Sequence, residues 1–490
     1  MDTLVSTRHG DVRGTRTAAG ILAFKGIPYA APPVGPNRFQ PPRPPQPWST
    51  PRDGTQYGPT APQSPAEDPA LALLPRVVIP GEDYLNLNVW TADTHARRPV
   101  MVFIHGGSFT SGSGSVPCYD GSAFARDGVV LVTINYRLGA DGFLWFGQGT
   151  PNLGLLDQIA ALTWVRDNIA CFGGDPANVT IFGESAGGMS VCTLLAMPAA
   201  RGLFHRAIAE SGAAHLVLSP ATAGLIGTRL AEILGVAPTR EAIAEVEPAR
   251  LVAAQDQVGM EVQAKPDPAL WGEVTRQLMP FEPVVDGELL PAPPFECIAA
   301  GASADVDILI GSNTEEARLF LVPTGLFGLA TEPLLLGMAA GYRLPAESLD
   351  RYRANRPGAS TGELVSAVMT DWFYRIPLLR IAETHPRTHV YEFAWRSPAF
   401  DGTLGSCHAL ELGFVFDTLA DPGLRRLLGE QPPQALADSV HRAWVDFATT
   451  GDPGWPAYRP DNRVSRLFDT VPAITTDDRA DERTLWDAIR

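Results

Sequence analysis

The segment from Val179 to Gly188 constrains the fold more than any other part of the sequence. A four-residue apolar run ending at Phe182 leads directly into Gly183-Glu184-Ser185-Ala186-Gly187. This matches the G-x-S-x-G pattern, in which glycines two residues either side of the serine permit a sharp turn from a strand into a helix. The pattern alone is weak in a chain with 47 glycines. Here, however, an apolar strand precedes it and a small-residue run follows it, as the tight turn requires, and this predicts a serine hydroxyl presented above a sheet.

Strand and helix patterns alternate on both sides of this motif. The segment from Asn152 to Ala170 predicts a helix, because apolar residues recur at helical spacing behind Asn152, a potential cap. Short β-branched or aliphatic runs bounded by turn residues predict strands at 85–90, 100–104, 129–135, 179–182, 207–210, 308–310 and 390–393. Alternation of this kind predicts an α/β fold with a mostly parallel central sheet flanked by helices.

Length alone would suggest about three domains of roughly 150 residues each. The richest stretch of glycine and proline, Pro32 to Pro69, predicts a long irregular surface segment, and no comparable break separates the middle of the chain from its C-terminal half. We expect one large domain over residues 1–490, because the candidate catalytic residues described below span residues 185 to 408 and must meet in one site.

Composition excludes several classes of partner. Acidic residues outnumber basic ones by 54 to 38, the net charge is −16, and no run of five or more Lys and Arg residues occurs, so we expect neither nucleic acid nor an anionic membrane as a partner. The N-terminal residues lack a basic start followed by an apolar stretch, which favours a soluble cytoplasmic protein. Five scattered cysteines predict free thiols and no disulfide or metal site: Cys118, Cys171, Cys192, Cys297 and Cys407.

A second glycine motif follows the strand predicted at 100–104. His105-Gly106-Gly107-Ser108-Phe109 stands well before the serine, where a strand-turn-helix serine site places the loop that binds an oxyanion. Glycines let backbone N–H groups approach a substrate closely, and each such donor contributes roughly 100-fold to 1000-fold in rate. The candidate donors are the N–H groups of Gly107, Ser108 and Ala186.

An activated serine also needs a base and a group that orients the base. Among nine histidines, His408 is favoured because it lies in a Gly/Ser/Cys loop and precedes the apolar stretch Leu412 to Phe416. The strand predicted at 308–310 runs into a turn that ends in Glu315 and Glu316. Spacing alone does not choose between these two carboxylates.

Several further motifs resemble those of the type-B carboxylesterases, the family that includes bacterial para-nitrobenzyl esterases and the cholinesterases. The resemblance covers nearly the whole chain and includes Phe24 to Ala30 with Arg38-Phe39, Glu82-Asp83, Leu85 to Trp90, Asn135 to Gly139, Asn152 to Gln158, Phe172 to Pro176, Phe182 to Gly188, Pro283 to Gly287 and Trp444 to Gly451. It implies the α/β-hydrolase fold, with large insertions forming the pocket walls. It also implies a serine carboxylesterase that needs no cofactor or metal and acts on a small-molecule ester and water, as a monomer or small homo-oligomer.

The resemblance assigns roles residue by residue. The family pattern Gly-x-Asn-x-x-Glu places the catalytic acid on Glu316, and the family's histidine falls on His408, so that the triad is Ser185, Glu316 and His408. The acyl and alcohol pockets would include Phe109, Met279, Leu319 and Phe320, although each of these residues could equally be part of the hydrophobic core.

The sequence departs from the family pattern in three ways, one of which removes the support for choline esters as substrates. The positions of a disulfide found in many members are Ala61 and Tyr84 here, and no tryptophan occurs between Trp48 and Trp90 to bind a choline cation. Ser108 replaces a glycine or alanine of the family's oxyanion loop, and Ala317 replaces the glycine after the catalytic acid. Neither change removes a backbone donor.

An amide or carbamate hydrolase with the same triad is the main alternative. A non-catalytic binding protein of the same fold is less expected, because all three triad residues are present.

Overall fold

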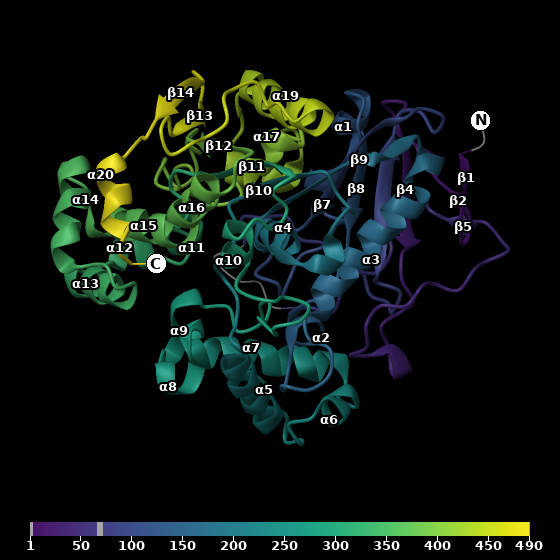
Figure 1. Ribbon diagram of the computed structural model, residues 1–490, viewed down its shortest axis with the longest axis horizontal. Helices are drawn as coiled ribbons and strands as arrows, with labels where there is room; N and C mark the ends of the chain where they lie inside the picture. The colour runs from purple at the N-terminus through teal and green to yellow at the C-terminus, as the bar shows by residue number, and fades with distance from the viewer. Residues whose placement is uncertain (1–2, 66–71, 490) are drawn as a thin grey trace.

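The computed structural model describes residues 3–65 and 72–489, and its main sheet has 11 strands over these residues. The strands follow one another across the sheet in the order β14 (Ala473–Thr476), β13 (Val464–Phe468), β12 (Thr388–Phe393), β11 (Asp307–Asn313), β10 (Arg206–Glu210), β9 (Gly174–Glu184), β7 (Arg98–Ile104), β8 (Val130–Ile134), β6 (Asn86–Thr91), β4 (Leu22–Pro28) and β3 (Thr15–Arg16). Strands β1 (Leu4–Thr7), β2 (Gly10–Arg13) and β5 (Arg52–Asp53) form a small second sheet at one end of the molecule (Figure 1).

The middle of the main sheet is parallel. Every neighbouring pair from β8 through β7, β9, β10, β11 and β12 to β13 is parallel, whereas β14 at one edge and β6, β4 and β3 at the other pair antiparallel. Parallel neighbours need long crossover connections, and helices supply them here. The prediction of an α/β fold with a mostly parallel sheet is confirmed.

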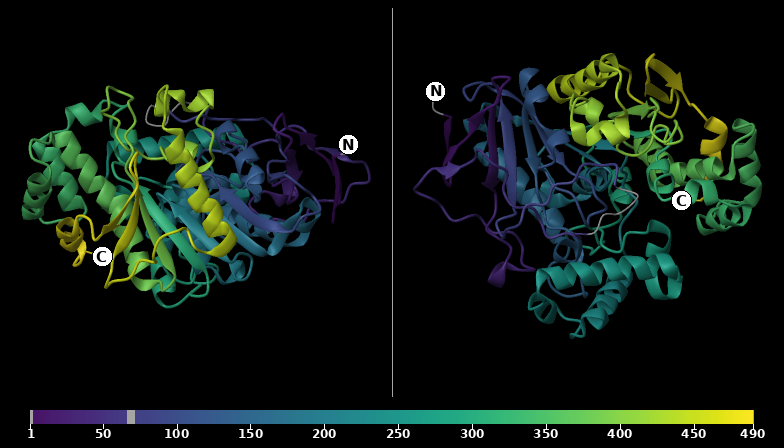
Figure 2. Two further views of the ribbon diagram at one scale, coloured as in Figure 1. Left: turned by 90° about the horizontal axis from the view of Figure 1, so that it is seen from above. Right: turned by 180° about the vertical axis from the view of Figure 1, so that it is seen from behind.

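The two faces of the sheet bury separate hydrophobic clusters. Along β7, Val100, Val102 and Ile104 belong to one cluster, and Met101 and Phe103 belong to the other, as the period-2 alternation of a strand requires. Helices α3 (Leu153–Asn168), α4 (Ala186–Ala196) and α16 (Ile376–Thr384) contribute to the first cluster. Helices α17 (Leu412–Val415) and α19 (Gln434–Thr450) contribute to the second, and α19 crosses the strands of the sheet (Figure 2). Because both faces are covered, the central strands are fully buried.

Two helical lobes extend from the sheet (Figure 1). One contains α5 (Pro220–Leu234), α7 (Pro248–Ala264) and α8 (Pro268–Trp271). The other contains α12 (Leu326–Leu329), α13 (Glu332–Gly341), α14 (Leu349–Asn355), α15 (Thr361–Thr370) and the C-terminal α20 (Ala480–Arg483). Shorter helices lie in the connections: α1 (Ser122–Arg126), α2 (Gly139–Phe143), α6 (Arg240–Ala244), α9 (Val274–Gln277), α10 (Pro294–Ala299), α11 (Arg318–Leu321) and α18 (Arg425–Leu428).

The predicted elements exist, with shifted boundaries. Strand β9 begins at Gly174, five residues before the apolar run, because Gly174 pairs with Arg98 of β7 ahead of an irregularity in the register that precedes the pairing of Val179 with Val100. Asn152 stands at the N-cap position of α3, but its side chain does not cap the helix. Instead its amide donates to Val284 O at 2.8 Å and its carbonyl accepts from Val284 N at 2.7 Å, which ties α3 to a distant loop. Residues 32–65 are mostly irregular as predicted, and 66–69 lie outside the described residues.

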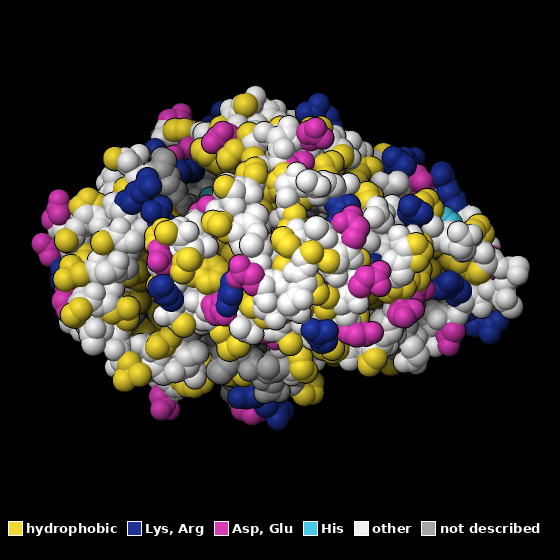
Figure 3. All heavy atoms as spheres, turned by 90° about the horizontal axis from the view of Figure 1, so that it is seen from below, with side chains coloured by type: hydrophobic (Ala, Val, Ile, Leu, Met, Phe, Trp, Pro, Cys, Tyr) yellow, Lys and Arg dark blue, Asp and Glu magenta, His cyan; other side chains and the backbone are white. Residues whose placement is uncertain are grey.

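Charged side chains of both signs are interspersed over the face of the molecule in Figure 3. Within residues 3–65 and 72–489, no helix combines the length and apolar character that a bilayer crossing needs. All five cysteines are free thiols.

Candidate active site

Ser185 occupies the turn between β9 and α4. Its backbone has φ 58° and ψ −123°, a conformation that costs free energy for any residue with a side chain. Hydrogen bonds hold this turn: Ser185 N donates to Glu210 O at 2.9 Å, and Met189 N donates to Ser185 O at 2.8 Å. A Cβ at Gly187 would lie 2.0 Å from Ile104 O, so glycine is required for the helix to pass this close to β7.

The loop after β7 packs against this turn. A Cβ on Gly106 would lie 3.0 Å from Ser185 Cβ, so the loop backbone directly adjoins the serine. Gly107, Ser108 and Phe109 all have positive φ, at 108°, 54° and 60°. The carbonyl of Gly107 accepts from Thr110 N and Ser111 N, and that of Phe109 accepts from Gly139 N at 2.7 Å. These bonds fix an unusual backbone conformation beside Ser185.

Gly107 and Ser108 carry the two candidate oxyanion donors of this loop. Outside regular elements, the backbone hydrogen bonds of residues 3–65 and 72–489 include none donated by Gly107 or Ser108. Ala186 is the first residue of α4, where a helix leaves its N–H groups without an intrahelical acceptor. The three candidate donors lie on the two segments that meet at Ser185.

His408 contacts Glu316 directly. Its Nδ1 lies 2.6 Å from Glu316 Oε2, and both side chains are buried. The other carboxylate oxygen of Glu316 accepts from Ser211 Oγ and from Asn313 N, each at 2.6 Å. Three donors therefore fix the carboxylate, and the carboxylate orients the imidazole.

Glu315 has a different role. It forms ion pairs with Arg318 at 2.8 Å and Arg396 at 2.5 Å, and Ser406 N donates to its Oε2 at 2.9 Å. These contacts hold the loop that carries His408. Of the two carboxylates that spacing left open, Glu316 is the one in contact with the histidine.

The second ring nitrogen of His408, Nε2, faces Glu184, the residue that precedes Ser185. Nε2 lies 3.0 Å from Glu184 Oε1. Within the described residues, Ser185 Oγ forms no hydrogen bond with the imidazole. Hydrogen bonds between nucleophile and base are often long or misaligned without substrate and tighten in the reacting complex. The structure thus brings Glu316 to His408 and places Ser185 next to their neighbour Glu184.

Four buried glutamates surround the site, and sequence reasoning gave a role to only one of them. Glu184, Glu210 and Glu411 join Glu316, and Glu184 and Glu210 are direct neighbours across β9 and β10. Trp444 Nε1 donates to Glu210 Oε1 at 3.0 Å, and Asn313 Nδ2 donates to Glu411 Oε2 at 2.6 Å. Glu210 ends the strand predicted at 207–210, but Glu184 lies two residues beyond the strand predicted at 179–182, and only the pairing of β9 with β10 brings the two together.

Burial and mutual repulsion alter the titration of this cluster. Burial, reinforced by the carboxylates of Glu411 and Glu316, raises the pKa of Glu184 to about 8. Burial, with the charge of Glu316, raises the pKa of Glu411 to about 7. Burial alone would lower the pKa of His408, but the carboxylates of Glu184 and Glu316 outweigh it and raise the pKa to about 9. Strongly shifted groups of this kind are typical of functional sites.

The four pocket candidates differ in position. Phe320 lies beside His408, with ring centroids 5.3 Å apart. Phe109 is fully buried and packs edge-on against Phe143 at 4.9 Å, whereas Leu319 is fully buried in the second hydrophobic cluster. Met279 is half-buried against the first cluster. Phe320 is thus the candidate whose ring packs beside the imidazole of His408.

Tyr374 is a further neighbour that the sequence did not reveal. Its ring centroid lies 5.0 Å from that of His408. Its position depends on a π-helical turn, which has no simple sequence pattern. The described residues contain no group of three or more His, Cys, Asp or Glu side chains placed to hold a metal ion.

Comparison with known proteins agrees with this architecture. The chain matches the carboxylesterase family over residues 1–466. It is 39% identical to the para-nitrobenzyl esterase of Bacillus subtilis (strain 168), over 98% of this chain and 97% of that protein. It is 34% identical to the phenmedipham hydrolase of Pseudarthrobacter oxydans, over 94% of this chain and 93% of that one.

Solved structures show the same similarity. The carboxylesterase EST55 of Geobacillus stearothermophilus superposes with a TM-score of 0.86 and 37% identity, covering 99% of this chain and 100% of that one. A para-nitrobenzyl esterase structure superposes with a TM-score of 0.84 and 36% identity, covering 99% of both chains. The chain therefore belongs to the carboxylesterase family and is a carboxylic ester hydrolase with the α/β-hydrolase fold.

Proposed function

We propose that this hydrolase cleaves esters through an acyl-enzyme on Ser185, with His408 as general base and acid and Glu316 as the group that orients it. The observation that carries the proposal is the 2.6 Å contact between His408 Nδ1 and Glu316 Oε2, in a buried site adjoining the strained turn of Ser185. Strain of this kind persists only where the surrounding structure holds it, and it clusters at functional sites.

In the first half of the cycle, His408 Nε2 takes the proton from Ser185 Oγ as that oxygen attacks the ester carbonyl. Glu316 keeps the proton on Nδ1 and stabilises the imidazolium that forms. The imidazolium then gives its proton to the leaving alcohol. In the second half, water enters, the same nitrogen takes its proton, and hydrolysis of the acyl-enzyme releases the carboxylic acid and regenerates Ser185.

The negative charge on the carbonyl oxygen needs donors that are in place before the reaction. We assign this role to the N–H groups of Gly107, Ser108 and Ala186. Two observations support the assignment: the first two are free of acceptors in the loop beside Ser185, and the third is at the N-terminus of α4. Phe320 would form part of the substrate pocket because it adjoins His408.

The proposal also covers the extent of the domain, the substrate, the oligomeric state and the location of the protein. We infer one catalytic domain over residues 1–490, since the main sheet takes strands from Thr15 to Thr476 and the proposed triad spans residues 185 to 408. The substrate is a small-molecule ester together with water, and the protein acts as a monomer or small homo-oligomer. The five free thiols support a location in the cytoplasm.

The test measures hydrolysis of para-nitrophenyl acetate and butyrate by the wild type, by Ser185→Ala and by a matched control, Ser49→Ala, at an exposed serine. We expect the control to match the wild type and Ser185→Ala to lose at least about 1000-fold in kcat. Equal rates for Ser185→Ala would remove the proposal. Anilides and aryl carbamates, measured in the same assay, test the alternative. A specificity at least tenfold higher for either would replace the ester assignment by an amide or carbamate hydrolase.

A further inference from the structure

Tyr374 belongs to a short π-helical segment of the chain. Asp371–Arg375 make a π-helical turn between α15 and α16, and all five side chains are buried. Single π-helical turns inserted into α-helices are rare and frequently occur at functional sites. The extra residue of such a turn changes the direction of the side chains that follow it. Neighbouring residues of one turn can therefore contact two different parts of the protein.

One face of this turn meets His408. The Tyr374 ring lies 5.0 Å from the imidazole at an interplanar angle of 42°, and Phe320 lies at 5.3 Å and 44°. Two aromatic rings thus limit the rotation of an imidazole that Glu316 holds at only one nitrogen. Polar contact and ring packing together determine where Nε2 points.

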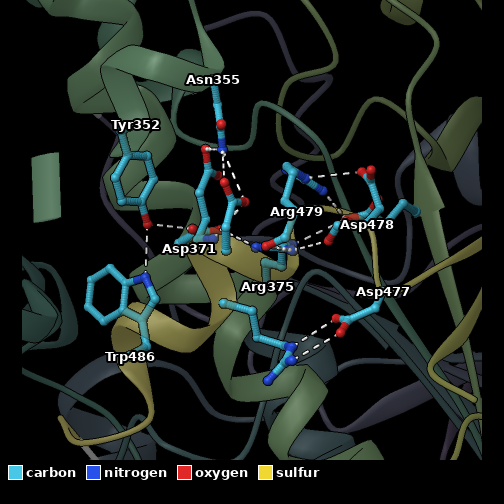
Figure 4. A network of polar contacts seen from close by, with 12 residues as sticks. Tyr352, Asn355, Asp371, Arg375, Asp477, Asp478, Arg479 and Trp486 are labelled. Atoms are coloured by element: carbon cyan, nitrogen blue, oxygen red, sulfur yellow. Dashed lines mark hydrogen bonds and ion pairs between the residues drawn. The ribbon is translucent and has the colours of Figure 1, made fainter. Parts of the chain in front are cut away.

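The other face of the turn meets the C-terminal segment, which we define as residues 477–486 (Figure 4). Arg375 is next to Tyr374 in the chain, and its Nη2 donates to Asp478 O at 2.5 Å and to Arg479 O at 3.3 Å. Its Nη1 also donates to Asp371 Oδ1 at 3.2 Å. This guanidinium is almost fully buried, so the loss of one of these partners would leave a buried donor unsatisfied.

A second connection runs through Tyr352 of α14. Its hydroxyl donates to Asp371 Oδ2 at 2.5 Å and accepts from Trp486 Nε1 at 2.8 Å. The Trp486 ring also packs on Trp372, with centroids 5.9 Å apart. Both ends of the π-helical turn are therefore tied to the C-terminal segment.

The segment itself is anchored to the body of the protein. Arg479 pairs with Glu392 of β12, and the buried Glu482 pairs with Arg356. Asn355 Nδ2 donates to Glu482 Oε1 at 2.9 Å (Figure 4). The segment thus bridges the sheet and α14, with the π-helical turn between them.

We propose that the C-terminal segment is a positioning element of the active site: through Arg375 and the Tyr352–Trp486 bridge it holds the π-helical turn so that Tyr374 packs on the imidazole of His408. The inference rests on the proposed function, in which His408 is the base. Tyr374 and Arg375 act through His408 and are positioning residues. Orientation errors of about 1 Å at a catalytic group can cost about 100-fold in rate, so a small shift of the turn suffices for a measurable loss.

The test is a double-mutant cycle with Tyr374→Leu and Arg375→Met, measured as kcat and KM for para-nitrophenyl acetate. We expect each single variant to lose about tenfold in kcat with KM within about twofold, because orientation and not substrate affinity is lost. If Arg375 acts through Tyr374, the double variant loses no more than the worse single variant. Additive losses in kcat would overturn the proposal.

Three further variants separate positioning from folding. Tyr374→Phe keeps the ring and should retain wild-type kcat. Trp486→Phe removes the N–H donor to Tyr352 and part of the buried indole ring, and should lower kcat in the same direction as Arg375→Met. If Arg375→Met does not fold, Trp486→Phe takes its place in the cycle. Arg387→Met is the matched control. It breaks an arginine–aspartate ion pair, Arg387 Nε to Asp307 Oδ1 at 2.6 Å, that does not involve the π-helical turn, and it should keep wild-type kcat.

The outcomes distinguish this inference from the proposed function. Wild-type kcat in Arg375→Met and Trp486→Phe, with lowered melting temperatures only, would make the segment a purely structural clamp and overturn the positioning role. The proposed function would stand in that case, as long as wild-type hydrolysis depends on Ser185. If hydrolysis does not depend on Ser185, both fail.

Discussion

Glu184 Oε1 lies 3.0 Å from His408 Nε2, on the side of the imidazole away from Glu316. Glu184 directly precedes Ser185, and its carboxylate lies beside the nitrogen that the proposed mechanism uses for proton transfer. It therefore stabilises the imidazolium and raises the pKa of His408, against the effect of burial, which lowers it. A base that must be neutral to work is thereby placed beside a group that favours its charged form.

Replacing Glu184 should move the pH dependence of activity. Glu184→Gln keeps the size of the side chain and removes the negative charge, so the pKa of His408 falls. Because the reaction needs neutral His408, the acidic limb of the kcat/KM profile should shift to lower pH. The profile for para-nitrophenyl acetate measures this, and an unchanged or alkaline-shifted limb would contradict the account.

The two neighbouring carboxylates at 315 and 316 should differ sharply. Glu316→Gln leaves an amide beside Nδ1, which no longer fixes the tautomer or stabilises the imidazolium, and kcat should fall about 1000-fold to 10,000-fold. Glu315→Gln changes the adjacent residue, which contacts Arg318 and Arg396 and not the histidine. It should keep kcat within about threefold while lowering thermal stability, as expected for a weakened ion-pair network. Equal losses of kcat in both variants would contradict the assignment of Glu316 as the group that orients His408.

The oxyanion loop should not tolerate a side chain at Gly107. A Cβ there would lie 2.3 Å from Ser111 O, and the residue has φ 108°, so Gly107→Ala forces the backbone to move. We expect kcat to fall about 100-fold to 1000-fold through loss of aligned N–H donors. Gly224→Ala, in α5 with no atom within 4 Å of the new Cβ, is the control and should leave kcat unchanged. Full activity of Gly107→Ala would argue against this loop as the oxyanion site.

Glu282 should make stability depend on pH. Its side chain is fully buried, neither carboxylate oxygen has a hydrogen-bond partner among the described residues, and burial raises its pKa well above the usual value. The folded state then holds a proton that the unfolded state releases, so the free energy of unfolding falls as pH rises above about 4.5.

Glu282→Gln removes this titration. The variant should be more stable than the wild type near pH 8, and this gain should shrink as pH falls toward 4, because the wild-type carboxyl titrates on unfolding and the amide does not. Thermal unfolding at several pH values measures the difference, with the exposed Glu288→Gln as control. A gain independent of pH would show that Glu282 does not titrate on unfolding.

Local patterns predicted the parts of the site that the chain builds locally. The turn at Ser185 and the glycine loop at Gly107 follow from adjacent residues, because a strand, a tight turn and a helix N-terminus each leave a sequence signature. The strands that carry them were predicted with correct type. Their ends were less accurate, since Gly174 belongs to β9 through pairing with Arg98, and pairing is a tertiary property.

The relations across the site were less accessible. Glu184 and Tyr374 come to His408 from segments far apart in sequence, and nothing local distinguishes a tyrosine that contacts an imidazole from one in the core. The same ambiguity affects Leu319 and Phe320: they are adjacent and apolar, but Leu319 is buried in the second hydrophobic cluster, whereas the Phe320 ring packs beside His408. Apolar character predicts burial and does not predict which cluster a side chain joins.

The central claim is that Ser185 becomes covalently acylated with His408 as its base. Intact-mass measurement after treatment with a fluorophosphonate, followed by peptide mapping, tests this most directly. The account predicts one adduct per chain, located on Ser185, absent in Ser185→Ala and formed at least about 100-fold more slowly in His408→Ala. An adduct on another residue, or rapid labelling that does not need His408, would contradict it.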